Sequence, residues 1–188
     1  AGGSITTGGQ FTASTAGNTT ISYSVTQNGC TTTATYPVTI NAGTTATITA
    51  GGPTSICSGS NVTLTASGGS TYVWNNGATT ASIVANTSGN YSVTVYNANG
   101  CSAISTPTTV TVNNPSVANV STSGPTTFCQ GNSVTFSAPA GNGNTYVWNT
   151  GATTQSVSTS TAGNFSVTVT NGYGCSASSA TSSVLVNP

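Results

Sequence analysis

A stretch of nine residues occurs twice in this chain. Residues 72–80 read YVWNNGATT, and residues 146–154 read YVWNTGATT. The two tryptophans are 74 positions apart (148 − 74), and Cys101 and Cys175 have the same separation (175 − 101). A fixed period of this length is the signature of tandem structural repeats, each of which is one folding unit.

The repeat divides the chain into three parts. Residues 43–114 and 115–188 are complete repeats, and residues 1–42 match only the second half of one, because residues 21–30 align with 91–101 and with 165–175. The partial copy has no tryptophan and a single cysteine, Cys30. We expect it to continue a longer array whose earlier half lies upstream; the alternative is completion by a neighbouring chain, since half a sandwich leaves an open sheet edge.

Short runs of alternating apolar and polar residues fill each complete repeat. Val62, Leu64 and Ala66, for example, fall on one face of a strand, and Thr63 and Thr65 fall on the other. About seven such runs with turn residues between them, and no helical period, predict an all-β fold of tandem Ig-like antiparallel β-sandwich modules. Regularly spaced apolar residues argue against a disordered chain. Four aromatic residues are predicted to lie in the cores: Trp74, Trp148, Tyr91 and Phe165.

The chain contains no Asp, Glu, Lys, Arg or His. It therefore has no carboxylate or imidazole for acid–base catalysis and no base to activate a hydroxyl nucleophile, so we expect no enzyme activity, cofactor or metal site. It has no basic patch for nucleic acid. Its apolar runs are too short to enter a membrane. A surface without net charge favours association between copies.

Five cysteines in such a chain suggest an oxidising compartment. The repeat predicts one structural disulfide within each complete copy, Cys57–Cys101 and Cys129–Cys175, closing loops of 44 and 46 positions (101 − 57 and 175 − 129). A zinc site is the weaker alternative, because each repeat offers only two cysteines and no histidine. Cys30 is left without a partner in the chain.

Several runs together resemble a known family. Residues 57–64 (CSGSNVTL), 72–74 (YVW), 89–95 (GNYSVTV) and 99–102 (NGCS) are similar to the Ig-like or PKD-like tandem repeats of large surface and secreted proteins of Bacteroidetes-type bacteria. The resemblance implies spacers, adhesin stalks and filament components. PKD repeats usually carry acidic residues after the tryptophan. Here Asn75, Asn76 and Gly77 follow it, and this departure from the family pattern argues against a calcium site built on carboxylates.

These observations predict a structural repeat segment of an extracellular or cell-surface filament, fibre or stalk, which self-associates into a polymer or belongs to a longer array. The alternative is an adhesin or carbohydrate-binding array, which needs exposed aromatic side chains. Glycans on the chain would supply hydration in place of charge. The candidate N-glycosylation sequons begin at Asn18, Asn61, Asn86, Asn90, Asn119 and Asn164.

Overall fold

The computed structural model describes residues 3–6 and 8–188, and these residues form strands, turns and loops without a helix. The chain divides into two compact units. The first contains residues up to Gly51, Thr63–Ile83 and Asn90–Thr109, and the second contains Gly52–Val62, Val84–Gly89 and Val110–Pro188. The division passes through the repeat of residues 43–114, so the repeat boundaries stay a prediction from the sequence.

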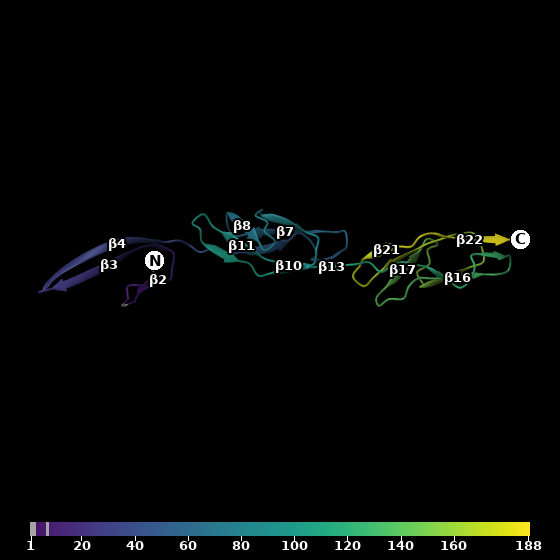
Figure 1. Ribbon diagram of the computed structural model, residues 1–188, viewed down its shortest axis with the longest axis horizontal. Helices are drawn as coiled ribbons and strands as arrows, with labels where there is room; N and C mark the ends of the chain where they lie inside the picture. The colour runs from purple at the N-terminus through teal and green to yellow at the C-terminus, as the bar shows by residue number, and fades with distance from the viewer. Residues whose placement is uncertain (1–2, 7) are drawn as a thin grey trace. The chain divides into compact units, whose positions relative to one another are not determined.

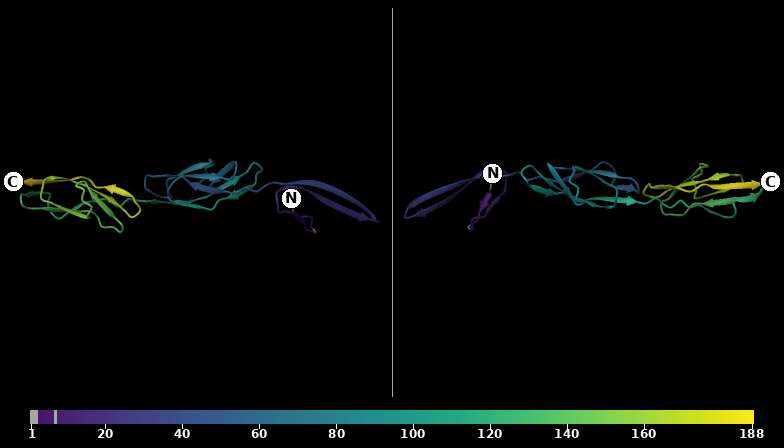
Figure 2. Two further views of the ribbon diagram at one scale, coloured as in Figure 1. Left: turned by 180° about the vertical axis from the view of Figure 1, so that it is seen from behind. Right: turned by 45° about the horizontal axis from the view of Figure 1, so that its top comes forward.

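The first strands form two hairpins. β1 (Gly3–Ile5) pairs with β2 (Phe11–Ala13), and β3 (Gly17–Gln27) pairs with β4 (Cys30–Ile40) along its whole length. Figure 1 shows β3 and β4 as a long ribbon of two strands. In Figure 2 and in the strand pairing, no further strand of the described residues joins this ribbon.

A two-residue turn closes the β3–β4 hairpin at Asn28 and Gly29. Their φ angles are 51° and 80°, and positive φ at both positions is what a type I′ turn requires. Asn tolerates positive φ, and Gly adopts positive and negative φ about equally well, so the Asn-Gly pair suits this turn. The turn places Cys30 at the first position of β4, opposite Gln27.

The first complete repeat forms three sheets of three strands, ordered β5-β7-β9, β8-β11-β12 and β6-β13-β10. Their bounds are β5 (Thr47–Ala50), β6 (Ser55–Cys57), β7 (Val62–Ser67), β8 (Thr71–Trp74), β9 (Ser82–Ala85), β10 (Gly89–Tyr91), β11 (Val93–Tyr96), β12 (Ser102–Ile104) and β13 (Thr108–Asn113). The pairing of β6 with β13 is parallel. Alternation holds as predicted on β7, where Val62, Leu64 and Ala66 are buried and the threonines between them are exposed.

The second complete repeat has the same sheets, ordered β14-β16-β18, β17-β20-β21 and β15-β22-β19. Their bounds are β14 (Ser121–Thr122), β15 (Thr127–Cys129), β16 (Val134–Ser137), β17 (Thr145–Trp148), β18 (Ser156–Thr159), β19 (Gly163–Phe165), β20 (Val167–Thr170), β21 (Ser176–Ser178) and β22 (Ser182–Asn187). At its centre Phe136 is stacked on Phe165, with ring centroids 5.0 Å apart, and is tilted against Trp148 at 6.4 Å.

The repeated nine-residue motif is a turn that closes beneath a buried tryptophan. The side chains of Trp74 and Trp148 are each 1% exposed, and their indole N–H groups donate to the carbonyl oxygens of Thr80 and Thr154 at 2.9 and 2.8 Å. A buried indole needs such an acceptor. Gly77 makes the turn possible, because its φ is 87°. The motif therefore serves the core.

The fold class is all-β, as predicted, and its modules are antiparallel sandwiches. The tryptophan lies on β8 or β17, beside the strand that precedes the second cysteine, and this is the C–F–G arrangement of an immunoglobulin sandwich. Phe165 is also buried. Tyr91, at the equivalent position, is only partly buried.

Hydroxyl groups pair across neighbouring strands on the solvent faces. Representative donor–acceptor distances are 2.7 Å for Ser24–Thr33, 2.7 Å for Thr135–Ser158 and 2.8 Å for Thr170–Ser176. Such cross-strand pairs stabilise a sheet without charge. Among the described residues, every buried side-chain nitrogen and oxygen has a hydrogen-bond partner.

Candidate functional site: the cysteine junction

The first cysteine of a repeat is held beside the last residues of that repeat. Cys57 ends β6, whose parallel partner β13 places Asn113 opposite it. The amide of Ser58 donates to the carbonyl oxygen of Asn113 at 2.8 Å, and the amide of Ser60 donates back to the carbonyl of Cys57 at 2.9 Å. Gly59, with φ of 89°, completes the turn. These two hydrogen bonds and the turn hold the backbone at Cys57 in place.

The second cysteine ends a loop that an asparagine side chain organises. The Oδ1 of Asn171 accepts hydrogen bonds from the amides of Tyr173 and Cys175, both at 3.0 Å. Its Nδ2 donates to the carbonyl oxygen of Asn114, at 2.8 Å, in the link that precedes the repeat. The amide group of Asn171 thus joins the loop that carries Cys175 to the link that precedes the repeat.

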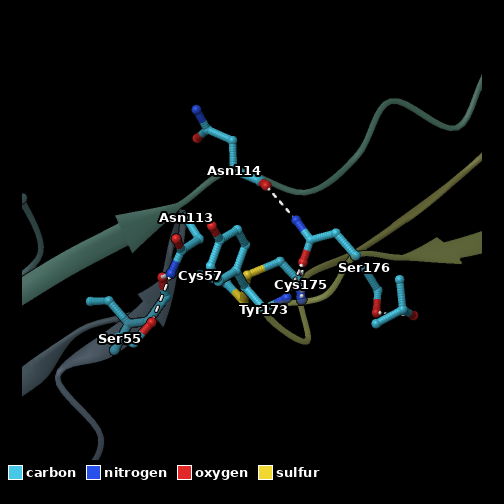
Figure 3. Close-up of a disulfide and its surroundings, with 10 residues drawn as sticks. Ser55, Cys57, Asn113, Asn114, Tyr173, Cys175 and Ser176 are labelled. Atoms are coloured by element: carbon cyan, nitrogen blue, oxygen red, sulfur yellow. Dashed lines mark hydrogen bonds between the residues drawn. A yellow bond between two sulfur atoms is a disulfide. The ribbon is translucent and has the colours of Figure 1, made fainter. Parts of the chain in front are cut away.

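A disulfide joins Cys57 to Cys175 within the second unit (Figure 3). Their Cα atoms are 5.5 Å apart, and Cys175 is 1% exposed. Figure 3 draws the bond together with the hydrogen bond from Asn113 Nδ2 to Ser55 Oγ, which measures 2.9 Å. The bond connects the first cysteine of one sequence repeat to the second cysteine of the next.

The predicted pairs Cys57–Cys101 and Cys129–Cys175 are therefore wrong in this structure. In the second repeat Cys129 lies opposite Asn187, at the end of β22 beyond its pairing with Gly163. The chain then runs from β19 through β20, away from that end, before it reaches Cys175. The two cysteines are separated by about 30 Å at the usual rise of a strand. A disulfide needs Cα atoms within about 7 Å.

Three cysteines have no disulfide in this chain. Cys30 and Cys129 are exposed, and Cys101 is half-buried. Cys101 ends a loop like that of Cys175: Asn97 Oδ1 accepts from the amides of Asn99 and Cys101, and its Nδ2 donates to the carbonyl of Ala42 at 2.9 Å. An asparagine four positions before the second cysteine, Asn97 or Asn171, is a sequence signal for this loop in both complete repeats.

The remaining candidate residues are on the surface. All six sequon asparagines are exposed, and two of them also serve the fold, because Asn90 and Asn164 accept hydrogen bonds from Thr109 and Ser183 at 2.7 Å. No group of three potential metal-binding side chains occurs in the described part of the chain. Nor do these residues contain a helix long and apolar enough to cross a membrane.

No protein-family model matches the chain, and neither does any curated protein sequence. The family resemblance seen in the sequence thus stays a hypothesis.

Several solved structures are similar to the chain, and they include domains of a capsid protein, extracellular domains and fibronectin(III)-like modules. The three N-terminal domains of the outer capsid protein Hoc of bacteriophage RB49 are 21% identical, with a TM-score of 0.39; the alignment covers 76% of this chain and 59% of that one. Extracellular domains 3–5 of Drosophila OTK give 13% identity, a TM-score of 0.40, and coverage of 92% and 72%. Fibronectin(III)-like modules of Clostridium thermocellum CbhA are 16% identical, with a TM-score of 0.35; the alignment covers 74% of this chain and 93% of that one. All three TM-scores are below 0.5, so the fold assignment rests on the strand topology.

Proposed function

We propose that this chain is a structural segment of an extracellular filament, fibre or stalk, in which copies associate through uncharged surfaces. The observation that supports the proposal most is the Cys57–Cys175 bond. It links successive sequence repeats, so a pulling force along the chain is resisted by a covalent bond outside the main chain as well as by the main chain itself.

The surface chemistry agrees with this role. The chain has no charged side chain, and cross-strand hydroxyl pairs cover its sheets. Copies of such a chain do not repel one another, and ions do not screen the contacts they form. A stable disulfide fits the oxidising exterior of a cell. We therefore place the protein outside the cell or on its surface, without enzymatic activity.

Electron microscopy of the purified 188-residue chain tests the proposal. We expect fibres that persist from low to molar NaCl and across mildly acidic to neutral pH, because the contacts involve no charged side chains. A chain that stays monomeric at high concentration, or fibres that dissolve when salt is raised, would contradict it.

A carbohydrate-binding or adhesin role is the second candidate, and one observation favours it. Tyr23 and Tyr36 are 69% and 71% exposed. The register pairs Tyr36 with Ile21 and Tyr23 with Ala34, so the two rings are diagonal neighbours on one face of the β3–β4 hairpin. Exposed aromatic rings can stack on sugars. A glycan array should then show binding that the Y23A/Y36A variant loses and that Y173A, which removes another exposed tyrosine, keeps.

A further inference from the structure

We propose that Cys129 of one copy of this chain forms a disulfide with Cys30 of a second copy, and that this bond joins copies end to end. The inference rests on the proposed function, because it names the partner and the atoms that connect successive subunits. The Cys57–Cys175 bond shows that the first cysteine of one repeat can join the second cysteine of the following repeat, which are the positions that Cys129 and Cys30 hold in the sequence.

Cys129 repeats the local structure of the bonded Cys57. β15 pairs in parallel with β22 and places Asn187 opposite Cys129, as Asn113 is opposite Cys57. The amide of Gln130 donates to the carbonyl of Asn187 at 2.9 Å, and Asn132 donates to Cys129 at 3.2 Å. A glycine with positive φ follows two positions after each of these cysteines, at 96° and 89°. Cys129 is nevertheless exposed and without a disulfide.

Cys30 repeats the presentation of the bonded Cys175. Each follows a glycine with φ of 80° at the end of a tight hairpin, Gly29 and Gly174. Each is the second cysteine of its repeat in the sequence alignment. Cys30 is exposed, whereas Cys175 is covered at its junction. The hairpin tip therefore offers an exposed thiol directly after a left-handed glycine, as at Cys175, but through a two-residue turn without the asparagine that organises the loop of Cys175.

The surface around Cys30 is open and partly apolar. A hollow of about 490 Å³ next to Cys30 is lined by Tyr23, Val25 and Ala34 and by the polar residues Gln27, Asn28 and Thr32. In the complete repeats the positions that align with Tyr23 and Val25 are held by valines that are at most 1% exposed. Burial of an apolar strand face of this kind by a partner is favourable, because it removes apolar surface from water. Such contacts would hold two copies in place while the thiols react.

A second hollow lies beside Cys129. Gln130, Ala162, Val186 and Asn187 line about 400 Å³ of space at this end of the sandwich. Two of these residues are neighbours of Cys129: Gln130 follows it in the chain, and Asn187 is its partner across the strands. The hairpin tip at Asn28-Gly29 that would approach this end carries no charge that would have to be desolvated.

Cys101 is the competing partner, and its surroundings make it the weaker one. It is half-buried, and the Asn97 side chain ties its loop to the carbonyl of Ala42. At the bonded junction, the equivalent residue Asn114 is the last residue of the repeat that contains Cys57. The loop that carries Cys101 is therefore already in contact with the segment of its own chain that ends at Ala42.

The chemistry requires a disulfide oxidant, such as oxidised glutathione or an oxidised dithiol protein. One cysteine, as its thiolate, attacks the oxidant disulfide, so that a mixed disulfide forms between the cysteine and one half of the oxidant and the other half leaves as a thiol. The second cysteine thiolate displaces the other half of the oxidant. The two cysteines lose two electrons and two protons in total, and the oxidant gains them as two thiols.

Two variants with a single free thiol each test the assignment. C30A/C101A keeps Cys129, and C129A/C101A keeps Cys30. Each is incubated alone, and the two are mixed in equal amounts in a buffer of oxidised and reduced glutathione. We expect the mixture to form at least tenfold more disulfide-linked dimer, twice the 18.2 kDa of one chain, than either variant alone. Mass spectrometry after elastase digestion should identify the Cys30–Cys129 peptide; trypsin is unsuitable because the chain has no Lys or Arg.

The outcomes separate the inference from the proposed function. Equal dimer in the mixture and in the separate samples, or dimer with no Cys30–Cys129 peptide, would overturn the inference. Electron microscopy of the wild-type chain is the independent readout: fibres without the bond contradict only the inference, and bonded dimers without fibres contradict the filament. The C101A variant should cross-link like wild type, and loss of cross-linking in C101A alone would also overturn the assignment to Cys30.

Discussion

Removing the disulfide between Cys57 and Cys175 should lower the free energy of unfolding by an amount that the structure sets. The two cysteines are 118 positions apart. For a loop of this size, the chain-entropy treatment gives about 16 cal/mol/K, which is about 5 kcal/mol at 25 °C and an upper value, since measured effects are often smaller. Both tryptophans lie between the two cysteines, so their fluorescence reports unfolding of this region.

The measurement compares urea unfolding of the C57A/C175A variant with that of wild type at low protein concentration. The matched control is C101A/C129A, which removes two cysteines but no bond of this structure. We expect the first variant to lose about 2–5 kcal/mol and the control to change by about 0.5 kcal/mol or less. Under the pairing predicted from sequence, both variants would break both bonds and lose equal stability. That result, or an unchanged C57A/C175A variant, would refute the reasoning.

Three further predictions follow from the contacts described. Phe136→Ala removes a fully buried ring that is stacked on another, and should cost about 3–5 kcal/mol in urea unfolding, whereas Leu185→Ala, at an exposed position, should cost about 0.5 kcal/mol or less. Asn171→Ala removes three hydrogen bonds that set the second cysteine in place, each worth about 1 kcal/mol, so thiol titration at a fixed glutathione ratio should show less of the disulfide; Asn97→Ala should leave it unchanged. Unfolding midpoints should shift little between low and molar NaCl, since no charged side chain exists to be screened, and a large stabilisation by salt at low concentration would contradict this.

The architecture could be read from the sequence because each of its signals is local. Alternation at Val62, Leu64 and Ala66 predicts a strand with one buried face whatever lies next to it, and the structure buries all three. The repeat of residues 72–80 at 146–154 predicts that both copies adopt one structure, and both tryptophans are buried with the same hydrogen bond. Period and spacing are sufficient for such conclusions.

The disulfide could not be read in this way, because repeat spacing is the same whether a first cysteine joins the second cysteine of its own repeat or that of the next. Only the strand directions decide. β22 ends beside Cys129, and the path through β20 carries Cys175 to the opposite end of the same sandwich. Distance along a strand, which sequence separation does not reveal, rules out the bond within the repeat and leaves the neighbouring repeat as the place where a partner sulfur can be reached.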